Sequence, residues 1–223
     1  MKFNLRARLV AEFIGTGFLV TAVIGSGIMG ERLAAGNVAI ALLANTIATG
    51  AALAALIVTF GPISGAHLNP AVTLSEAIQR AICWPEAAVY MAAQFAGGIA
   101  GAIVAHLMFG LPWYSFSSHS RHGRMQALSE FVATFGLLSV IGGCSRFKSD
   151  ALPFAVASYI VAAYWFTAST SFANPAVTVA RALSDTFAGI RPADAPVFVA
   201  AQITGAFTAT LLFRWLIQNA SEG

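Results

Sequence analysis

Six long apolar segments follow one another along this 223-residue chain and restrict what it can fold into. A helix needs roughly 20 apolar residues to cross the hydrocarbon core of a bilayer, and each segment is close to that length. The composition agrees, because 58% of the residues are hydrophobic and 9% are charged, against about 25% charged in a typical soluble domain. We predict an all-α membrane protein with six transmembrane helices, over Ala7–Met29, Val38–Phe60, Pro85–Phe109, Gln126–Cys144, Ala151–Ala168 and Ala193–Leu216.

The charged and sulfur-containing residues argue against several classes of function. A net charge of +3, scattered along the chain, is too small to indicate a nucleic-acid partner. Cys83 and Cys144 form no CxxC pair, and four histidines with few acids leave little material for a metal site. We therefore expect no metal, no cofactor and no enzymatic activity.

Short motifs recur in the same order in the two halves of the chain. Ala11-Glu12-Phe13 matches Ser129-Glu130-Phe131, and Ala93-Gln94 matches Ala201-Gln202. Between them, Asn69-Pro70-Ala71-Val72-Thr73 matches Asn174-Pro175-Ala176-Val177-Thr178. The offsets are nearly constant, at 130 − 12 = 118, 174 − 69 = 105 and 202 − 94 = 108 residues. This indicates an internal duplication within one domain over 1–223, with a first repeat at 1–118 and a second at 119–223.

Each repeat contains three predicted spans, which is an odd number. The second repeat must therefore enter the membrane from the opposite side to the first. In such an inverted repeat, the functional site lies near the middle of the membrane, at the interface between the repeats.

The repeated Asn-Pro-Ala motif predicts two short helices that meet at this interface. Asn is a favoured N-cap and Pro is favoured at the first helical position. The helices over Asn69–Gln79 and Asn174–Ser184 would each be roughly 16 Å long at 1.5 Å per residue. Neither can cross about 30 Å of hydrocarbon alone, but two can when placed end to end.

The chemistry of this meeting point favours neutral solutes. Each helix start carries roughly half a positive charge, which repels cations and protons. The side-chain oxygen of Asn69 or Asn174 can cap its own helix, while the amide NH₂ donates to a passing oxygen. The extended segments Ile63–Leu68 and Ser169–Ala173 would present carbonyls to a water-filled cavity, where irregular backbone is tolerated.

On these motifs, together with Ser64-Gly65-Ala66-His67-Leu68 before the first Asn, the chain resembles the aquaporin (major intrinsic protein) family over nearly its whole length. The resemblance implies an aquaporin-like fold of six transmembrane helices and two re-entrant half-helices in an inverted repeat. It implies a passive channel in the lipid bilayer of the inner (plasma) membrane, assembled as a homotetramer with cytoplasmic termini. The charges support that orientation weakly, with seven Lys or Arg on the predicted inner side and five on the outer.

The same resemblance places a selectivity filter at four positions, counted from the two motif asparagines: Thr49, Ala162, Ser171 and Val177. Family members usually carry Arg at the last position, and Val supplies neither charge nor donor. With small residues at all four positions, we expect a wide aperture. The pattern is similar to that of arsenic-associated bacterial aquaglyceroporins, which implies passage of water, glycerol-like polyols and metalloid acids such as arsenous acid or methylated arsenicals.

Several further residues admit two interpretations. Glu12 and Glu130 could form a proton relay, but their matched placement favours bracing of the backbone N–H groups of the re-entrant loops. His67 and Gly65 are expected to line the pore or to support the first loop. Arg181 lies one turn past Val177 and either adds positive charge to the outer vestibule or has a structural role, which we favour.

Two other classes of function compete with the channel. A proton- or sodium-coupled secondary transporter also uses inverted repeats, but it needs a titratable or ion-binding residue beside the substrate. An intramembrane enzyme could use Ser26 of Gly25-Ser26-Gly27 with His67 as base. No strand–turn–helix context supports that, and it would leave the paired motifs unexplained.

Overall fold

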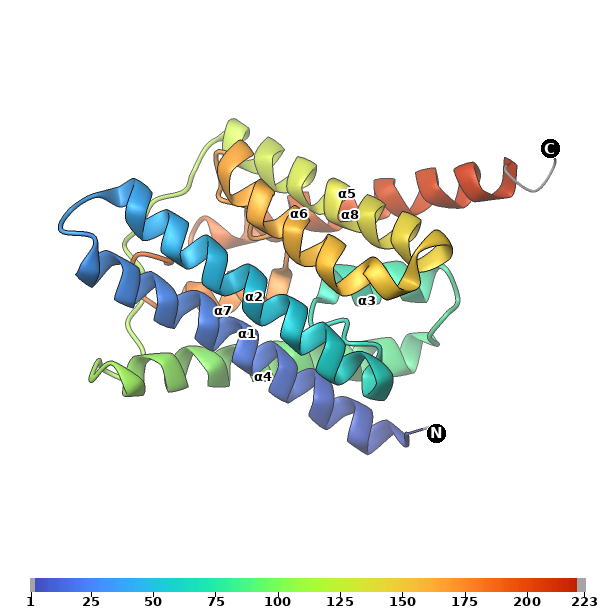
Figure 1. Ribbon diagram of the computed structural model, residues 1–223, viewed down its shortest axis with the longest axis horizontal. Helices are drawn as coiled ribbons and strands as arrows, with labels where there is room; N and C mark the ends of the chain where they lie inside the picture. Colours follow the sequence, from blue (N-terminus) through green and yellow to red (C-terminus); the bar gives the residue numbers. More distant parts are fainter. Residues whose placement is uncertain (1–2, 220–223) are drawn as a thin grey trace.

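The computed structural model describes residues 3–219, and within that range the chain is helical and contains no strand. All the long helices run roughly along the longest axis of the molecule (Figure 1). This confirms the predicted all-α class. The elements are α1 (Leu5–Leu33), α2 (Val38–Ser64), α3 (Pro70–Ile78), α4 (Trp84–Met108), α5 (Arg124–Phe147), the 3₁₀ turn η1 (Ser149–Ala151), α6 (Leu152–Phe166), α7 (Pro175–Arg181) and α8 (Ala195–Asn219).

Helix α1 begins, and helix α8 ends, at the same end of the molecule (Figure 1). We call this the terminus end and the opposite one the far end. The short helix α3 lies in the half nearer the terminus end, and the short helix α7 lies in the half nearer the far end. The two half-helices therefore occupy opposite halves of the molecule, which is the arrangement that an inverted repeat predicts.

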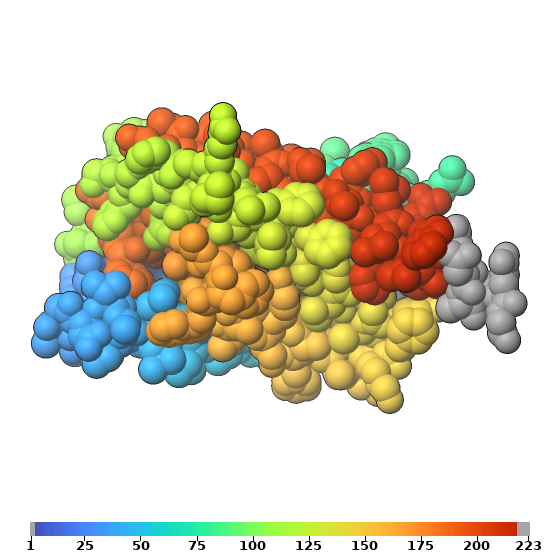
Figure 2. All heavy atoms as spheres, turned by 90° about the horizontal axis from the view of Figure 1, so that it is seen from above, coloured from blue at the N-terminus to red at the C-terminus, as the bar shows by residue number. Residues whose placement is uncertain are grey.

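Five helices in the described part of the chain are long and apolar enough to cross a membrane: α1, α2, α4, α5 and α8. The fifth predicted span, Ala151–Ala168, is the exception in length. It forms α6, which has 15 residues and a length of roughly 22 Å, preceded by η1. Figure 2 shows α6 lying beside α5 on the face seen from above.

The second span begins at the predicted residue and ends four residues later than predicted (64 − 60 = 4). Helix α2 continues beyond Phe60 through Pro62 to Ser64. Proline removes one hydrogen bond near the end of a helix, and a single missing bond there does not stop the remaining turn. Gly65 then ends the helix with φ of 91°, a left-handed conformation that glycine adopts without steric cost. Residues 63 and 64 are therefore helical rather than extended.

Three glycines allow long helices to cross in close contact. A Cβ on Gly97 would overlap the carbonyl of Phe13, and one on Gly101 would overlap the carbonyl of Gly17. In the second half, Gly205 of α8 packs in the same way against the carbonyl of Phe131 on α5. Small residues at such crossings are typical of helices packed inside membranes, where close backbone approach provides the attraction.

Large apolar side chains cover the outside of the bundle. Phe18, Ile47 and Phe154 are between 57% and 62% exposed, and many similar residues lie on the outer faces of the long helices. Exposed apolar surface on this scale does not suit water, but it suits hydrocarbon. Together with the long apolar helices, it supports a multi-pass membrane protein.

A candidate pore between two half-helices

A cavity of about 270 Å³ lies among the helices and reaches past both Asn-Pro-Ala motifs. Its wall includes Glu76 and Ser145 on the side of the terminus end, and Tyr164 and Arg181 on the side of the far end. Asn69 and Asn174 line the part between. The site that the sequence predicts at the centre of the molecule therefore coincides with a cavity.

On each long helix that lines the cavity, the lining residues are spaced about four positions apart. On α6 the lining residues are Leu152, Val156, Ile160 and Tyr164. Because residues four apart lie on one face of a helix, each helix presents a single stripe to the cavity. The other stripes are Leu19 and Val23 on α1, Thr49, Leu53 and Ile57 on α2, and Leu137, Ile141 and Ser145 on α5.

Each motif asparagine caps its own half-helix. Asn69 Oδ1 accepts from the backbone N–H of Ala71 at 2.8 Å. Asn174 Oδ1 accepts from Ala176 N at 3.0 Å and from Val177 N at 3.2 Å. Both asparagines have extended backbone, and Pro follows each at the first helical position, as the motif predicts.

The same two asparagines also tie the halves together. Asn69 Nδ2 donates to the carbonyl of Ala173 at 2.8 Å, and Asn174 Nδ2 donates to the carbonyl of Leu68 at 2.8 Å. Each amide NH₂ therefore donates one of its two hydrogens to the opposite loop. The sequence did not predict this reciprocal pair of bonds, and the donor to a passing solute stays a prediction.

Glu12 holds the first re-entrant loop. Its Oε1 accepts from Ser64 Oγ at 2.6 Å and from His67 N at 3.0 Å. Its Oε2 accepts from Leu68 N at 2.7 Å and from Gln94 Nε2 at 2.8 Å. The carboxylate is fully buried, and its four donors satisfy it as a buried acceptor must be satisfied.

Glu130 does the same for the second loop. It accepts from the backbone N–H groups of Phe172 and Ala173, each at 2.9 Å, and from Gln202 Nε2 at 2.6 Å. Gln202 also donates to Thr178 Oγ1, just as Gln94 donates to Thr73 Oγ1. These bonds are the ones that the loop-bracing interpretation of both glutamates requires.

The two loops share an unusual backbone conformation. Ala66 and Leu68 have φ of 46° and 49°, and Ser171 and Ala173, which lie 105 residues later, have φ of 49° and 48°. Left-handed backbone at residues other than glycine costs free energy and is found where the surroundings impose it, often at functional sites. The extended conformation predicted for these loops is therefore wrong, because the surrounding bonds hold them in left-handed turns.

Three of the four predicted filter residues line the cavity: Thr49, Ser171 and Val177. Ala162 does not; it is exposed on the outer side of α6. Tyr164 and Ile160 form that part of the wall instead, and the Tyr164 hydroxyl lies 3.4 Å from Thr49 Oγ1. The residue count from Asn174 points to the wrong face because it ignores where α6 ends.

His67 and Gly65 both line the cavity. The His67 ring contacts Tyr90, with 5.4 Å between ring centroids, and its Nδ1 lies 3.1 Å from Thr73 Oγ1. The Nδ1 atom of His67 therefore contacts a residue in the first turn of α3. His67 thus combines a pore-lining position with a contact that supports the loop.

Arg121, in the segment between α4 and α5, holds the second loop from the far end. Its Nε donates to Gly189 O at 2.8 Å, and its Nη1 donates to Ser169 O at 3.1 Å. Burial lowers the pKa of this guanidinium. Sequence reasoning missed this role, because nothing in the local sequence around Arg121 indicates its distant carbonyl partners.

Within residues 3–219, no group of three His, Cys, Asp or Glu side chains lies close enough to hold a metal ion. The cavity wall instead consists of aliphatic side chains, amides, hydroxyls and loop backbone, with Glu76, His67 and Arg181 as its ionisable members. Such a wall suits the passage of a small polar molecule.

Comparison with known proteins decides the family. The model of the major intrinsic protein family matches residues 1–146 and 142–223. The chain belongs to the major intrinsic protein family. Members of this family are membrane channels that pass water and small solutes, and they are not enzymes. The channel class predicted from the sequence is confirmed, and the enzyme alternative is set aside.

Individual family members support this assignment. The chain is 54% identical to "Aquaglyceroporin AqpS" of Rhizobium meliloti (strain 1021) over 98% of this chain and 94% of that protein. It is 37% identical to "Aquaporin NIP1-4" of Oryza sativa subsp. japonica over 63% of this chain and 51% of that one. The X-ray structure of the aquaglyceroporin from Plasmodium falciparum superposes with a TM-score of 0.73 at 19% identity, covering 94% of this chain and 96% of that one, which shows the shared fold.

Proposed function

We propose that this channel conducts water together with small neutral hydroxylated solutes, namely glycerol-like polyols and metalloid acids such as arsenous acid or methylated arsenicals. The observation that carries the proposal is the composition of the far half of the cavity, where Val177 stands in place of arginine beside Ser171 and Thr49. Val177 offers no charge and little bulk, while the two hydroxyl-bearing residues can replace part of a solute's hydration.

Tyr164 refines the expected width of the aperture. Its ring stands where the residue count had placed the methyl group of Ala162, so the passage is narrower than four small residues would leave it. Its hydroxyl adds a third hydrogen-bonding group to those of Thr49 and Ser171. We therefore assign the filter to Thr49, Tyr164, Ser171 and Val177, a set that favours slender solutes carrying several hydroxyls.

The central part of the pore excludes ions in this proposal. Asn69 and Asn174 each keep one amide hydrogen for the solute, and two helix starts face one another there. A hydrated cation would meet positive partial charges and would lose water without gaining carboxylate ligands. Glu12 and Glu130 do not help it, because their oxygens already accept from the loops.

The surroundings of the channel follow from the same family assignment. The exposed apolar residues of the long helices would face the lipid bilayer or neighbouring protomers of a homotetramer. We place the protein in the inner (plasma) membrane with the terminus end on the cytoplasmic side. The domain would comprise two inverted repeats, 1–118 and 119–223.

Stopped-flow measurements on proteoliposomes test the proposal. Water, glycerol, urea and arsenous acid are compared side by side, with protein-free liposomes as the control. We expect water, glycerol and arsenous acid to cross faster than in the control, at rates that do not depend on an imposed proton or sodium gradient. Passage of water alone would contradict the solute assignment, and gradient-driven accumulation would favour the coupled transporter.

A further inference from the structure

Arg181 is a buried cation without an ion-pair partner in the described structure. Its side chain is 2% exposed, and the ion pairs within residues 3–219 join Arg8 to Glu86 and Arg191 to Asp194. Buried arginines are rare unless paired, because removing a charge from water is costly. A buried, unpaired arginine is stabilised when an anion or a hydrogen-bond acceptor binds to it.

The contacts of Arg181 use only part of its guanidinium. Its Nε donates to the carbonyl of Ala188, and its Cζ lies 3.3 Å from the centroid of the Phe172 ring. Its Nη1 is buried and has no hydrogen-bond partner among the described residues. The Ala188 bond and the ring contact hold the guanidinium in place and leave Nη1 as a donor without a partner in the described structure.

Ser171 supplies a second unused group in the same part of the cavity. Its side chain is 2% exposed, and its Oγ likewise has no partner among the described residues. Ser171 and Arg181 both line the cavity, next to Val177 of the same wall. Two buried polar groups without partners cost free energy unless an incoming molecule completes their hydrogen bonds.

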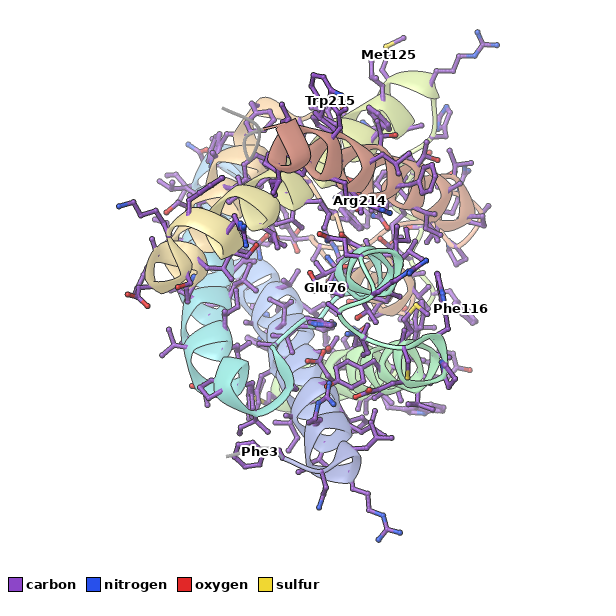
Figure 3. The ribbon with its side chains drawn as sticks, turned by 90° about the vertical axis from the view of Figure 1, so that its right-hand side faces the viewer. Phe3, Glu76, Phe116, Met125, Arg214 and Trp215 are labelled. Atoms are coloured by element: carbon purple, nitrogen blue, oxygen red, sulfur yellow. The ribbon has the colours of Figure 1, made fainter. Side chains whose placement is uncertain are left out.

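The inverted repeat gives this charge a counterpart of opposite sign. Arg181 lies seven residues after Asn174 (181 − 174 = 7), and Glu76 lies seven residues after Asn69 (76 − 69 = 7). Both line the same cavity, and Glu76 stands near the middle of the terminus end in Figure 3. The cavity is therefore electrically polarised, with a cation on the far side and an anion on the terminus side.

Within residues 3–219, no carboxylate contacts Arg181 directly. Glu130 attracts it through space, but the Glu130 oxygens accept from Phe172, Ala173 and Gln202. A second cation, Arg121, lies over the same Phe172 ring, with its Cζ 5.1 Å from the centroid. The far half of the cavity is thus lined by a guanidinium that makes no ion pair within residues 3–219.

We propose that Arg181 and Ser171 form a subsite that binds the monoanion of a small tetrahedral oxyacid as it enters from the far end. Guanidinium donors match two oxygens of such an anion, and the Ser171 hydroxyl can donate to a third or to the same oxygen. The subsite deepens the proposed function, on which it rests, by adding charged oxyacids to the solutes that the far half of the pore recognises. Glu76 on the opposite side would oppose their onward passage, so binding there need not mean fast conduction.

Binding is measured with methylphosphonate, at a pH where it is a monoanion, by thermal unfolding of the intact protein in detergent. We expect a concentration-dependent rise in Tm for the wild type, because a ligand that binds the folded state stabilises it. In Arg181→Lys and in Ser171→Ala, the concentration needed for the same rise should increase about tenfold. The neutral diester dimethyl methylphosphonate should give no comparable rise.

Matched variants separate the subsite from general effects of charge and folding. Arg124→Gln removes an exposed arginine at the start of α5 and should leave the methylphosphonate response unchanged. Alanine can adopt the left-handed backbone conformation of position 171, because Ala66 already does so at the equivalent position of the first loop. Ser171→Ala should therefore leave the loop conformation intact. Equal stabilisation of the wild type and both site variants, or an equal loss in Arg124→Gln, would overturn the subsite.

Glycerol flux distinguishes this inference from the proposed function. If wild-type proteoliposomes conduct no glycerol but methylphosphonate still stabilises the protein through Arg181 and Ser171, the solute assignment fails and the subsite stands. If glycerol passes and the site variants respond to methylphosphonate as the wild type does, the subsite fails and the solute assignment stands.

Discussion

The hydroxyl of Tyr164 donates a hydrogen bond to Thr49 Oγ1 at 3.4 Å and so connects α6 with α2 beside the cavity. The two residues come from different halves of the chain and are separated by 115 positions. Both are buried and both line the cavity. Their contact fixes one side of the filter that we propose, and it makes the Tyr164 ring a determinant of width.

Tyr164→Ala should widen the filter and raise glycerol permeability relative to water permeability. A reduction in the glycerol barrier of about 1.4 kcal/mol would give a tenfold change in this ratio. Stopped-flow light scattering on proteoliposomes measures both permeabilities. Tyr164→Phe keeps the ring but removes the hydroxyl that bonds Thr49, so it should change the ratio much less than Tyr164→Ala does. Ala162→Leu alters a side chain outside the cavity, so a change there as large as in Tyr164→Ala would contradict our placement of the filter.

Val177→Arg should narrow the far half of the cavity and add a fixed cation. Water should continue to pass, whereas the permeabilities to glycerol and arsenous acid should fall tenfold or more. A tenfold fall corresponds to a barrier raised by about 1.4 kcal/mol. Arsenous acid is neutral near neutral pH, so bulk and not charge is the main cause for it. Val177→Leu enlarges the side chain without adding charge, so comparing it with Val177→Arg separates the effect of bulk from the effect of charge. A proportional fall in water and in the larger solutes would count against a filter at this position.

The parts of this structure that local chemistry dictates were predictable from the sequence. Asn is a favoured N-cap and Pro is favoured at the first helical position, so the beginnings of α3 and α7 follow from the motif. Glu12 and Glu130 are acids inside apolar helices, and burial requires that their oxygens be satisfied. Their matched places in the repeat then pointed to the two loops as the source of donors.

The parts that depend on distant contacts were not predictable. Ala66 and Ser171 have left-handed backbone that their side chains do not favour, and the loop bonds impose it. The twelve-residue offset from Asn174 came from the family resemblance and ignored where α6 ends, so it gave Ala162 in place of Tyr164. A usable signal did exist in the four-residue spacing of Val156, Ile160 and Tyr164.

Asn69→Asp and Asn174→Asp, alone or together, should let cations leak through the pore. Each substitution turns a donor to the opposite loop into an acceptor facing a carbonyl and adds negative charge between two helix starts. We expect sodium or proton conductance to rise about tenfold, as for a barrier lowered by about 1.4 kcal/mol. Ion-sensitive dyes trapped in proteoliposomes report this leak.

Asn45→Asp is the matched control for these substitutions. Asn45 is equally buried and donates to Val23 O at 2.8 Å, but it does not line the cavity. It should lower stability without opening a leak. An unchanged conductance in the folded double variant of Asn69 and Asn174 would argue against an ion barrier at the centre.

Glu12→Gln and Glu130→Gln should each destabilise the protein and reduce flux of every solute. The new NH₂ group would face N–H donors of the loop, leaving at least one buried donor unsatisfied at a cost of about 1–3 kcal/mol. Thermal unfolding in detergent and flux in liposomes measure the two effects. Glu86→Gln breaks the partly exposed pair with Arg8 and should cost about 1 kcal/mol or less. Normal Tm and flux in both glutamate variants would leave the bracing role without support.

The crossed bonds of the two asparagines have a consequence for biogenesis. The donor of Asn69 finds its carbonyl 104 residues later, and the donor of Asn174 reaches back 106 residues. During synthesis, the first re-entrant loop must therefore wait, with Leu68 and Asn69 incompletely bonded, until the second loop has entered the membrane. The conducting path therefore forms only after both loops are in the membrane. If the two halves are produced as separate chains, they should conduct only when both are expressed in the same cell.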